Sequence, residues 1–226
     1  MKLYASVLTI LVLLAGCGES QPAGDGAGNG QKAAQPEKAL APERVNRLKE
    51  GTSEGMATPE EQRLFDALLA ASETNDWDRT RALAFSPEVR GSTNADLRTQ
   101  AVASLAWFGE KAIDDLVEYV KDEDEEVYSA AIGEWSTVLA LIEDDRQRAD
   151  KVSSAMKRVS RASALEQIAM ECNSLPGEFA AMALLDVIEN GTIKQRRVAA
   201  EAYSFVTGED FESREKTLKW IEENKE

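Results

Sequence analysis

The fold is decided by residues 96–135, which read DLRTQAVASLAWFGEKAIDDLVEYVKDEDEEVYSAAIGEW. Apolar side chains recur in this stretch at every third or fourth position, which is the spacing of one helix face. The first series ends at Gly109, a residue type that commonly closes a helix, and a second series follows after a short corner. The two series consist of Leu97, Ala101, Leu105 and Phe108, and of Ile113, Leu116, Val117 and Val120. They predict two helices joined as an antiparallel hairpin.

The same pattern returns along the rest of the chain. Thirty residues after Leu97, a new apolar series begins at Val127 and continues through Trp135. Strand signals are few, because apolar residues seldom alternate with polar ones. About five such pairs of helices fit between residues 58 and 226, which gives a mean period near 34 residues. We therefore expect an all-α fold in which antiparallel helical hairpins stack into an α-solenoid.

Helix boundaries carry their own signals at both ends of this region. Thr58 precedes Pro59 and stands three residues before Glu61, which predicts a capping box at a helix start. The predicted signals near the C-terminus are Thr192 as an N-cap, Gly208 as a stop and Ser213 as the start of the last helix. The buried face of the helix between them is predicted to consist of Val198, Ala202, Phe205 and Val206.

The stretch quoted above resembles the short HEAT repeats of bacterial proteins. The shared features are a charged residue, an Ala-rich first helix, a Gly corner, an apolar second helix and an acidic link. The last stretch, AAEAYSFVTGEDFESREKTLKWIEEN, also resembles a tetratricopeptide hairpin, although the marker Trp and Pro of those repeats are not at the expected places. Either resemblance implies a scaffold or binding surface and does not imply a catalytic site.

The N-terminus reads as a secretion signal. One Lys is followed by an almost unbroken apolar run from Leu3 to Gly16, too short for a transmembrane helix. Residues 14–17, LAGC, resemble the lipobox of bacterial lipoproteins, which implies cleavage after residue 16 and acylation of Cys17 with diacylglycerol and a further acyl chain such as palmitate. Two or more chains give stable anchoring. Gly18 at the second mature position, in place of Asp, favours the outer membrane of a Gram-negative cell.

The next segment, residues 17–57, is predicted to be a disordered tether behind the lipid anchor. It is rich in Gly, Ala, Gln, Pro and charged residues and nearly free of large apolar side chains. Such a composition cannot offset the entropy of ordering through burial. We therefore divide the chain into a signal peptide (residues 1–16), a lipidated tether (residues 17–57) and a helical repeat domain (residues 58–226).

The formal charge of −15 lies entirely in the predicted helical domain, where residues 58–226 hold twenty basic and thirty-five acidic side chains. An acidic domain repels phosphate groups, so nucleic acid and direct binding to lipid headgroups are not expected. The partner is instead expected to be another envelope protein with a basic or neutral surface. Membrane contact should occur only through the anchor.

The chain contains no His. This absence removes Ser-His-Asp and Cys-His nucleophiles and the usual zinc, copper and non-haem iron sites, so we predict neither a metal nor a cofactor and no enzymatic activity. Cys172 falls on an apolar helix face and is expected to be buried and inert. Two alternatives to a protein-binding scaffold remain: a cell-wall glycan hydrolase that uses carboxylates alone, and a passive structural lipoprotein.

The densest acidic run is the weak candidate for a binding surface. It consists of Asp122, Glu123, Asp124, Glu125 and Glu126. The run lacks the Gly turn and ligand spacing of a calcium loop, and Asp124 is well placed to cap the next helix. A solvated link between repeats is therefore its structural interpretation. The acidic doublets at 114–115 and 144–145 are poor glycosidase pairs, because adjacent helical residues point in different directions. The basic cluster at 194–197 is expected to pair with an acidic link of the preceding repeat.

Overall fold

The computed structural model describes Met56 and residues 58–224, and all regular secondary structure in this part of the chain is helical. The predicted all-α class is therefore confirmed for these residues. The predicted signal peptide, the lipid attachment site Cys17 and the tether lie outside the described residues, apart from Met56. None of the helices in the described part is long and apolar enough to cross a membrane.

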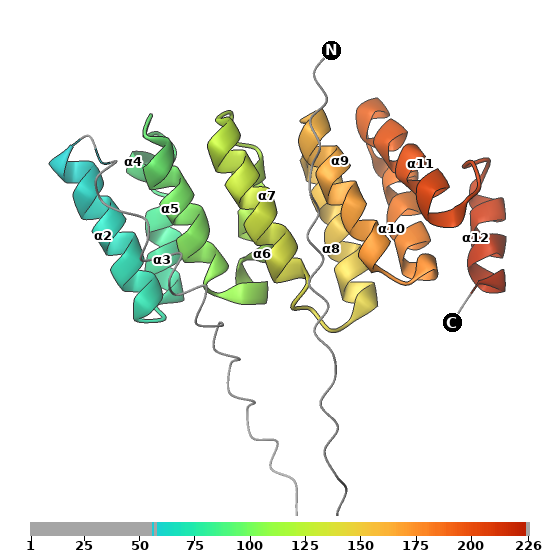
Figure 1. Ribbon diagram of the computed structural model, residues 1–226, viewed down its shortest axis with the longest axis horizontal. Helices are drawn as coiled ribbons and strands as arrows, with labels where there is room; N and C mark the ends of the chain where they lie inside the picture. Colours follow the sequence, from blue (N-terminus) through green and yellow to red (C-terminus); the bar gives the residue numbers. More distant parts are fainter. Residues whose placement is uncertain (1–55, 57, 225–226) are drawn as a thin grey trace, which may run out of the picture. The chain divides into compact units, whose positions relative to one another are not determined.

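Eleven α-helices and two short 3-10 helices follow one another along residues 58–224 (Figure 1). Their bounds are α2 Pro59–Glu73, α3 Trp77–Ala84, α4 Pro87–Arg90, α5 Ala95–Ala106, η2 Gly109–Ala112, α6 Ile113–Val120, α7 Glu125–Leu139, α8 Asp145–Arg158, α9 Ala162–Met170, η3 Glu171–Ser174, α10 Gly177–Asn190, α11 Ile193–Thr207 and α12 Arg214–Glu223.

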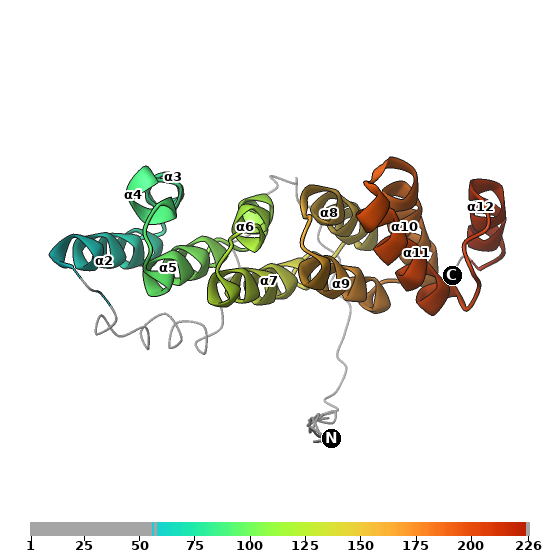
Figure 2. The ribbon, with the colours of Figure 1, turned by 90° about the horizontal axis from the view of Figure 1, so that it is seen from above.

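The helices of this part lie in two layers (Figure 2). One layer contains α2, α5, α7, α9 and α11, and each of these helices contacts the next. The other layer contains α3 and α4 at one end, followed by α6, α8, α10 and α12, and here too α6, α8, α10 and α12 touch in succession. From α4 onwards, the chain therefore passes back and forth between the two layers from one helix to the next.

One apolar core joins the two layers, and it runs from Leu64 in α2 to Ile221 in α12. The predicted face residues Leu97 and Leu105 are fully buried within it. Trp135 is the largest fully buried side chain, at 1% exposure, which confirms its predicted place in the core. Truncating such a residue to Ala typically costs about 3–5 kcal/mol.

The predicted helix boundaries are confirmed where the signals are local. Thr58 and Glu61 form a capping box, and the Thr192 hydroxyl caps α11 in the same way with Gln195 as its partner. Gly208 closes α11 with φ of +73°, a conformation that costs Gly little and other residues more. Ser213 caps α12. At the starts of α2, α11 and α12, side-chain oxygens thereby accept hydrogen bonds from backbone N–H groups that have no partner within the helix.

Some helices pack most extensively against a different neighbour from the one in their predicted hairpin. Helix α6 contacts α5 across the Gly109 corner, as expected, but packs more extensively against α7. Likewise α10 packs most extensively against α11. The reason lies in α6 itself, which has eight residues of which five are buried, so that it faces more than one neighbour.

The last helix rests on α10 through a close approach. Trp220 of α12 lies over Gly177, the first residue of α10, and a methyl group at position 177 would lie 3.1 Å from the Cη2 atom of the indole. Because Gly177 has no side-chain carbon, the Trp220 ring can occupy the space above it.

Candidate functional site

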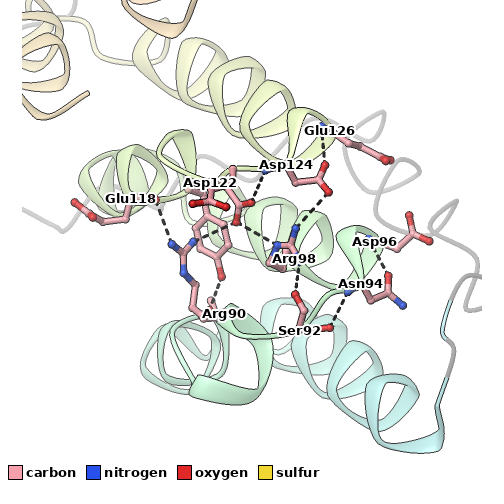
Figure 3. A network of polar contacts seen from close by, with 12 residues as sticks. Arg90, Ser92, Asn94, Asp96, Arg98, Glu118, Asp122, Asp124 and Glu126 are labelled. Atoms are coloured by element: carbon pink, nitrogen blue, oxygen red, sulfur yellow. Dashed lines mark hydrogen bonds and ion pairs between the residues drawn. The ribbon is translucent and has the colours of Figure 1, made fainter. Parts of the chain in front are cut away.

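The acidic run singled out from the sequence forms the link between α6 and α7 and the first turn of α7 (Figure 3). Two of its carboxylates shape the link. Asp122 accepts a hydrogen bond from the backbone N–H of Asp124 at 3.0 Å, and Asp124 accepts one from the N–H of Glu126 at 3.0 Å. Asp124 is therefore the N-cap of α7, as predicted. Negative charge is favourable at this end of a helix.

Arg98 of α5 joins this link to the preceding turn. Its Nε lies 3.2 Å from Oδ2 of Asp122, and its Nη2 lies 3.4 Å from Oδ2 of Asp124. A further guanidinium nitrogen donates to the carbonyl oxygen of Ser92. The side chains of Arg98 and Asp122 are both 9% exposed. Arg98, whose own side chain solvent scarcely reaches, thus contacts three acceptors at once (Figure 3).

Two more arginines close around the same link. The guanidinium of Arg90 stacks 4.3 Å from the ring centroid of Tyr119, and that of Arg161 stacks 4.0 Å from the ring of Tyr128. Arg161 also donates to the carbonyl oxygens of residues 122 and 123, at 2.9 and 3.1 Å. Cation–π contacts of this kind each contribute about 0.5–2 kcal/mol. The link is therefore fixed by side chains from α4, α5 and the start of α9.

Tyr119 belongs to this arrangement as well. Its hydroxyl donates a hydrogen bond to the carbonyl oxygen of Ala84, at the end of α3. Burial, outweighing the nearby positive charge of Arg90, raises the pKa of the Tyr119 phenol above its usual range. The side chain therefore acts as a neutral donor that ties α6 to α3.

These contacts leave only part of the acidic run available to a partner. Asp122 and Asp124 are engaged in the fold, whereas Glu123, Glu125 and Glu126 are exposed. The hollow beside the link has a volume of about 610 Å³ and is lined by equal numbers of basic and acidic side chains, which are Arg90, Arg98, Lys121, Asp122, Glu123 and Asp124. Such a lining favours neither anions nor cations. Within the described residues, no group of three or more acidic, His or Cys side chains is arranged to hold a metal ion.

The acidic doublets diverge toward separate partners. Asp114 pairs with Lys151 of α8 at 2.6 Å, whereas Asp115 pairs with Arg81 of α3 at 2.6 Å. Asp144 caps α8 through its side chain. Asp114 and Asp115 thus stabilise the packing of different neighbours, whereas Asp145 pairs with Arg148 of its own helix at 2.9 Å.

The basic cluster at the start of α11 reaches the preceding link, but through the backbone. Lys194 donates to the carbonyl oxygen of Ser160 at 3.0 Å, and Arg196 donates to the carbonyl oxygen of Gly191 at 2.7 Å. Arg197 pairs within its own helix with Glu201, at 3.7 Å. The expected ion pair with an acidic link is therefore replaced by carbonyl acceptors, which carry partial negative charge where helices end.

A second surface, which the sequence interpretation missed, is an apolar groove between α9 and α11. Its volume is about 250 Å³. Met170 at the end of α9 and Phe205 near the end of α11 line it and are 66% and 76% exposed. The prediction that Phe205 belongs to the buried face of α11 is therefore wrong. Buried Val198 does lie on that face, but Phe205, about two turns later, stands at the rim of the groove.

The floor and the rim of this groove differ in chemistry. Ala169 and Ala202 leave space at the floor because their side chains are small, and Asn173 extends the α9 wall. Glu166 on α9 and Glu201 on α11 are its charged lining residues, and both are exposed. The groove is therefore apolar at the centre and acidic on both sides. A signal for it was present in the sequence, since residues 166, 170 and 173 and residues 198, 201 and 205 each follow helical spacing.

Cys172 lies in η3 and is fully buried. Burial, with a smaller contribution from the charge of Glu171, raises the pKa of its thiol to about 12. The thiol is therefore neutral at physiological pH, as the prediction of a buried, inert Cys requires.

No protein-family model, no curated protein and no solved structure matches the chain.

Proposed function

We propose that this chain is a lipid-anchored protein of the bacterial cell envelope whose helical domain is a scaffold that binds another protein. The observation that carries the proposal is the groove between α9 and α11, where Met170 and Phe205 stay exposed beside an apolar floor. Large apolar side chains gathered in one concave place commonly mark a protein-binding surface.

The spacing of contacts between helices supports a stacked-repeat scaffold of the HEAT-like kind, with a tetratricopeptide-like stack as the alternative. Several polar contacts join residues that lie 33 to 35 positions apart, close to the period near 34 inferred from the sequence. They are Arg81 with Asp115, Ser136 with Glu171, Ser153 with Asp186, and Lys194 with the Ser160 carbonyl. Contacts of this kind are expected when each repeat packs on the next.

The place of action is inferred from the N-terminal sequence. The lipobox-like residues 14–17 favour attachment at Cys17, and Gly18 favours the outer membrane, facing the periplasm, in a Gram-negative cell. The acidic character of residues 58–226 favours a protein partner with a basic or neutral surface over nucleic acid. An anchor would also raise the local concentration of the scaffold near membrane partners.

A binding role is favoured over catalysis by the way the carboxylates are used. A glycan hydrolase that relies on carboxylates needs two of them facing one cleft, about 5 to 9.5 Å apart. Asp114 and Asp115 instead turn to α8 and α3. The lining acids of the groove, Glu166 and Glu201, flank an apolar floor suited to side chains.

Photo-cross-linking in living cells tests the proposal. A photoreactive residue replaces Asn173, which lines the groove, in the native chain and in a Cys17→Ala chain. The matched control carries the same residue in place of Ile193, which is 87% exposed but does not line the groove. We expect position 173 of the native chain to give one discrete product with another envelope protein, and position 193 to give none.

The Cys17→Ala chain should leave the membrane fraction and lose most of that product. Equal background from positions 173 and 193 would contradict the assignment of the groove as a binding surface. A native chain that fractionates away from membranes would contradict the lipid anchor.

A further inference from the structure

We propose that the α9–α11 groove receives a basic amphipathic helix of the partner protein, with an apolar side chain seated between Met170 and Phe205. This inference rests on the proposed function and specifies the chemistry of the occupant. The recognition mode is a helix laid in a groove, in which apolar residues on one face serve as anchors.

The size of the groove limits what it can hold. A volume of about 250 Å³ lies below the range of about 300–1,000 Å³ typical of small-molecule sites. Its lining is open to solvent, since Met170 and Phe205 at its sides are mostly exposed. One or two large apolar side chains of a helix fit such a space, and the helix itself would cover the rim. Met adapts its shape to different anchors, and an aromatic wall gives them a large contact area.

The charge of the rim selects the flanking residues of the occupant. Glu166 and Glu201 lie on opposite walls, and none of the residues lining the groove is basic. Lys or Arg side chains beside the apolar anchor would meet a carboxylate on each side. Arg197 pairs with Glu201 at 3.7 Å, but both side chains are about two-thirds exposed. A pair of that exposure is weak, so a cation of the partner can share Glu201 or replace Arg197.

The same charges argue against other occupants. A second copy of this chain docked through the same groove would bring Glu166 and Glu201 against their own equivalents. An anionic lipid surface would meet the same repulsion. An acidic or purely apolar helix would bring no positive charge to either rim carboxylate. A basic amphipathic helix is the occupant that offers apolar side chains to the floor and positive charges to the acidic rim.

The test uses the purified full-length chain and two labelled helical peptides of about 18 residues, followed by fluorescence anisotropy at low and physiological salt. The first peptide has Leu at positions i, i+3, i+4 and i+7 and Lys at the remaining positions. The second keeps the Leu pattern and replaces every Lys with Glu. We expect the Leu/Lys peptide to bind and the Leu/Glu peptide to bind at least about tenfold more weakly, because like charges across an interface repel.

Two groove variants and two matched controls locate the binding. Phe205→Ser should weaken binding of the Leu/Lys peptide at least about thirtyfold, which is the usual loss at a central anchor. Its control is Ile193→Ser, an exposed apolar residue of the same helix outside the groove. The double variant Glu166→Gln/Glu201→Gln should weaken binding about tenfold at low salt and less at high salt. Its control, Glu123→Gln/Glu125→Gln, removes the same charge from the α6–α7 link and its adjoining helix turn.

The controls should bind the Leu/Lys peptide within about twofold of the native chain. Equal weakening by groove and control variants would overturn the inference, because it would show attraction to the acidic domain as a whole. Equal binding of the two peptides would also overturn it. Should position 173 still cross-link an envelope protein in either of those cases, the scaffold function would stand and only the chemistry assigned to its occupant would fall. A cross-link from position 173 to a second copy of the chain, or to the chain's own tether, would overturn the inference directly.

Discussion

Arg98 Nε lies 3.2 Å from Asp122 Oδ2, and water scarcely reaches either side chain of this pair between α5 and the α6–α7 link. Removing one partner of a buried ion pair leaves the other charge without compensation, which typically costs about 3–5 kcal/mol. Because Arg98 also contacts Asp124 and the Ser92 carbonyl, its loss would release the link from the preceding turn.

We therefore expect Asp122→Ala to lower the free energy of unfolding by about 3 kcal/mol. Urea denaturation followed by circular dichroism measures this change. Glu123→Ala is the matched control, since it removes an exposed carboxylate from the next position and should change the free energy by about 0.5 kcal/mol or less. Similar values for the two variants would show that the ion pair does not hold the link.

Asp186 of α10 predicts a dependence of stability on pH. Burial raises its pKa, but hydrogen bonds from Lys157, Ser153 and Asn190 outweigh burial and lower the pKa below its usual range. The Lys157 Nζ atom lies 2.5 Å from the carboxylate, across the contact between α8 and α10. In the unfolded chain, an Asp titrates near about 3.9.

The lower pKa of Asp186 in the folded chain determines how stability changes with pH. Above the unfolded pKa, the folded chain holds the carboxylate charged with its partners and gains stability, and that gain is lost as pH falls through the lower folded pKa. We expect Asp186→Asn to flatten the decline in free energy of unfolding below about pH 5, measured by urea denaturation at successive pH values. Asp150→Asn, at an exposed position of α8, should leave the decline as steep as in the native chain. An equal slope for both variants would contradict the role of Asp186.

The third prediction concerns Gln195, whose side chain hydrogen-bonds both to the α8–α9 link and to the start of its own helix, α11. Its amide nitrogen donates to the carbonyl oxygens of Lys157 and Val159, at 2.9 and 2.8 Å, while its amide oxygen accepts from the N–H of Thr192 at 2.7 Å. The side chain is 4% exposed. Gln195→Ala should lower the free energy of unfolding by about 2 kcal/mol, since buried groups would lose their partners.

The matched control for this change is Gln167→Ala on the exposed face of α9. Thr192→Ala removes only the cap and should cost about 1 kcal/mol. Thermal or urea unfolding of the three variants gives the comparison. A loss in Gln195→Ala no larger than that in Thr192→Ala would mean that the bonds to the α8–α9 link contribute little.

The burial of Cys172 is expected to make its thiol react slowly with disulfide reagents. Since burial raises the pKa of its thiol to about 12, a Cys17→Ala chain, in which Cys172 is the one remaining Cys, should react with a disulfide reagent at pH 8 at least about a thousandfold more slowly than free cysteine. Added urea should restore the reaction as the chain unfolds. Introducing an exposed thiol through Ser160→Cys should give one fast equivalent. Rapid reaction of Cys172 without urea would show that η3 opens readily.

Local signals made much of the helical architecture predictable. Thr58, Thr192, Gly208 and Ser213 end or begin helices because a cap is formed by residues only a few positions apart. The place of Trp135 also followed from periodicity, since an apolar series identifies one helix face. Whether the helices form a repeat stack stays a prediction.

Contacts between distant positions were beyond the same reasoning. Arg98 and Asp122 are 24 residues apart, and nothing in either segment marks the other as its partner. Phe205 shows a different limit, because helical spacing identifies a face without telling which neighbour covers it. The groove needed both α9 and α11 in place before Met170 and Phe205 could be seen on its two walls. The acidic run shows the reverse case, in which a conspicuous motif is partly consumed by the fold at Asp122 and Asp124.

The close approach of Trp220 to Gly177 links two positions that lie 43 residues apart in the sequence. A larger side chain at position 177 would push the indole away and loosen the end of the chain, unless position 220 became smaller at the same time. Among relatives of this protein, the two positions are therefore expected to vary together, a small residue at one accompanying a bulky residue at the other. The docking of α12 on α10 would then be maintained in evolution by compensating substitutions at these two positions.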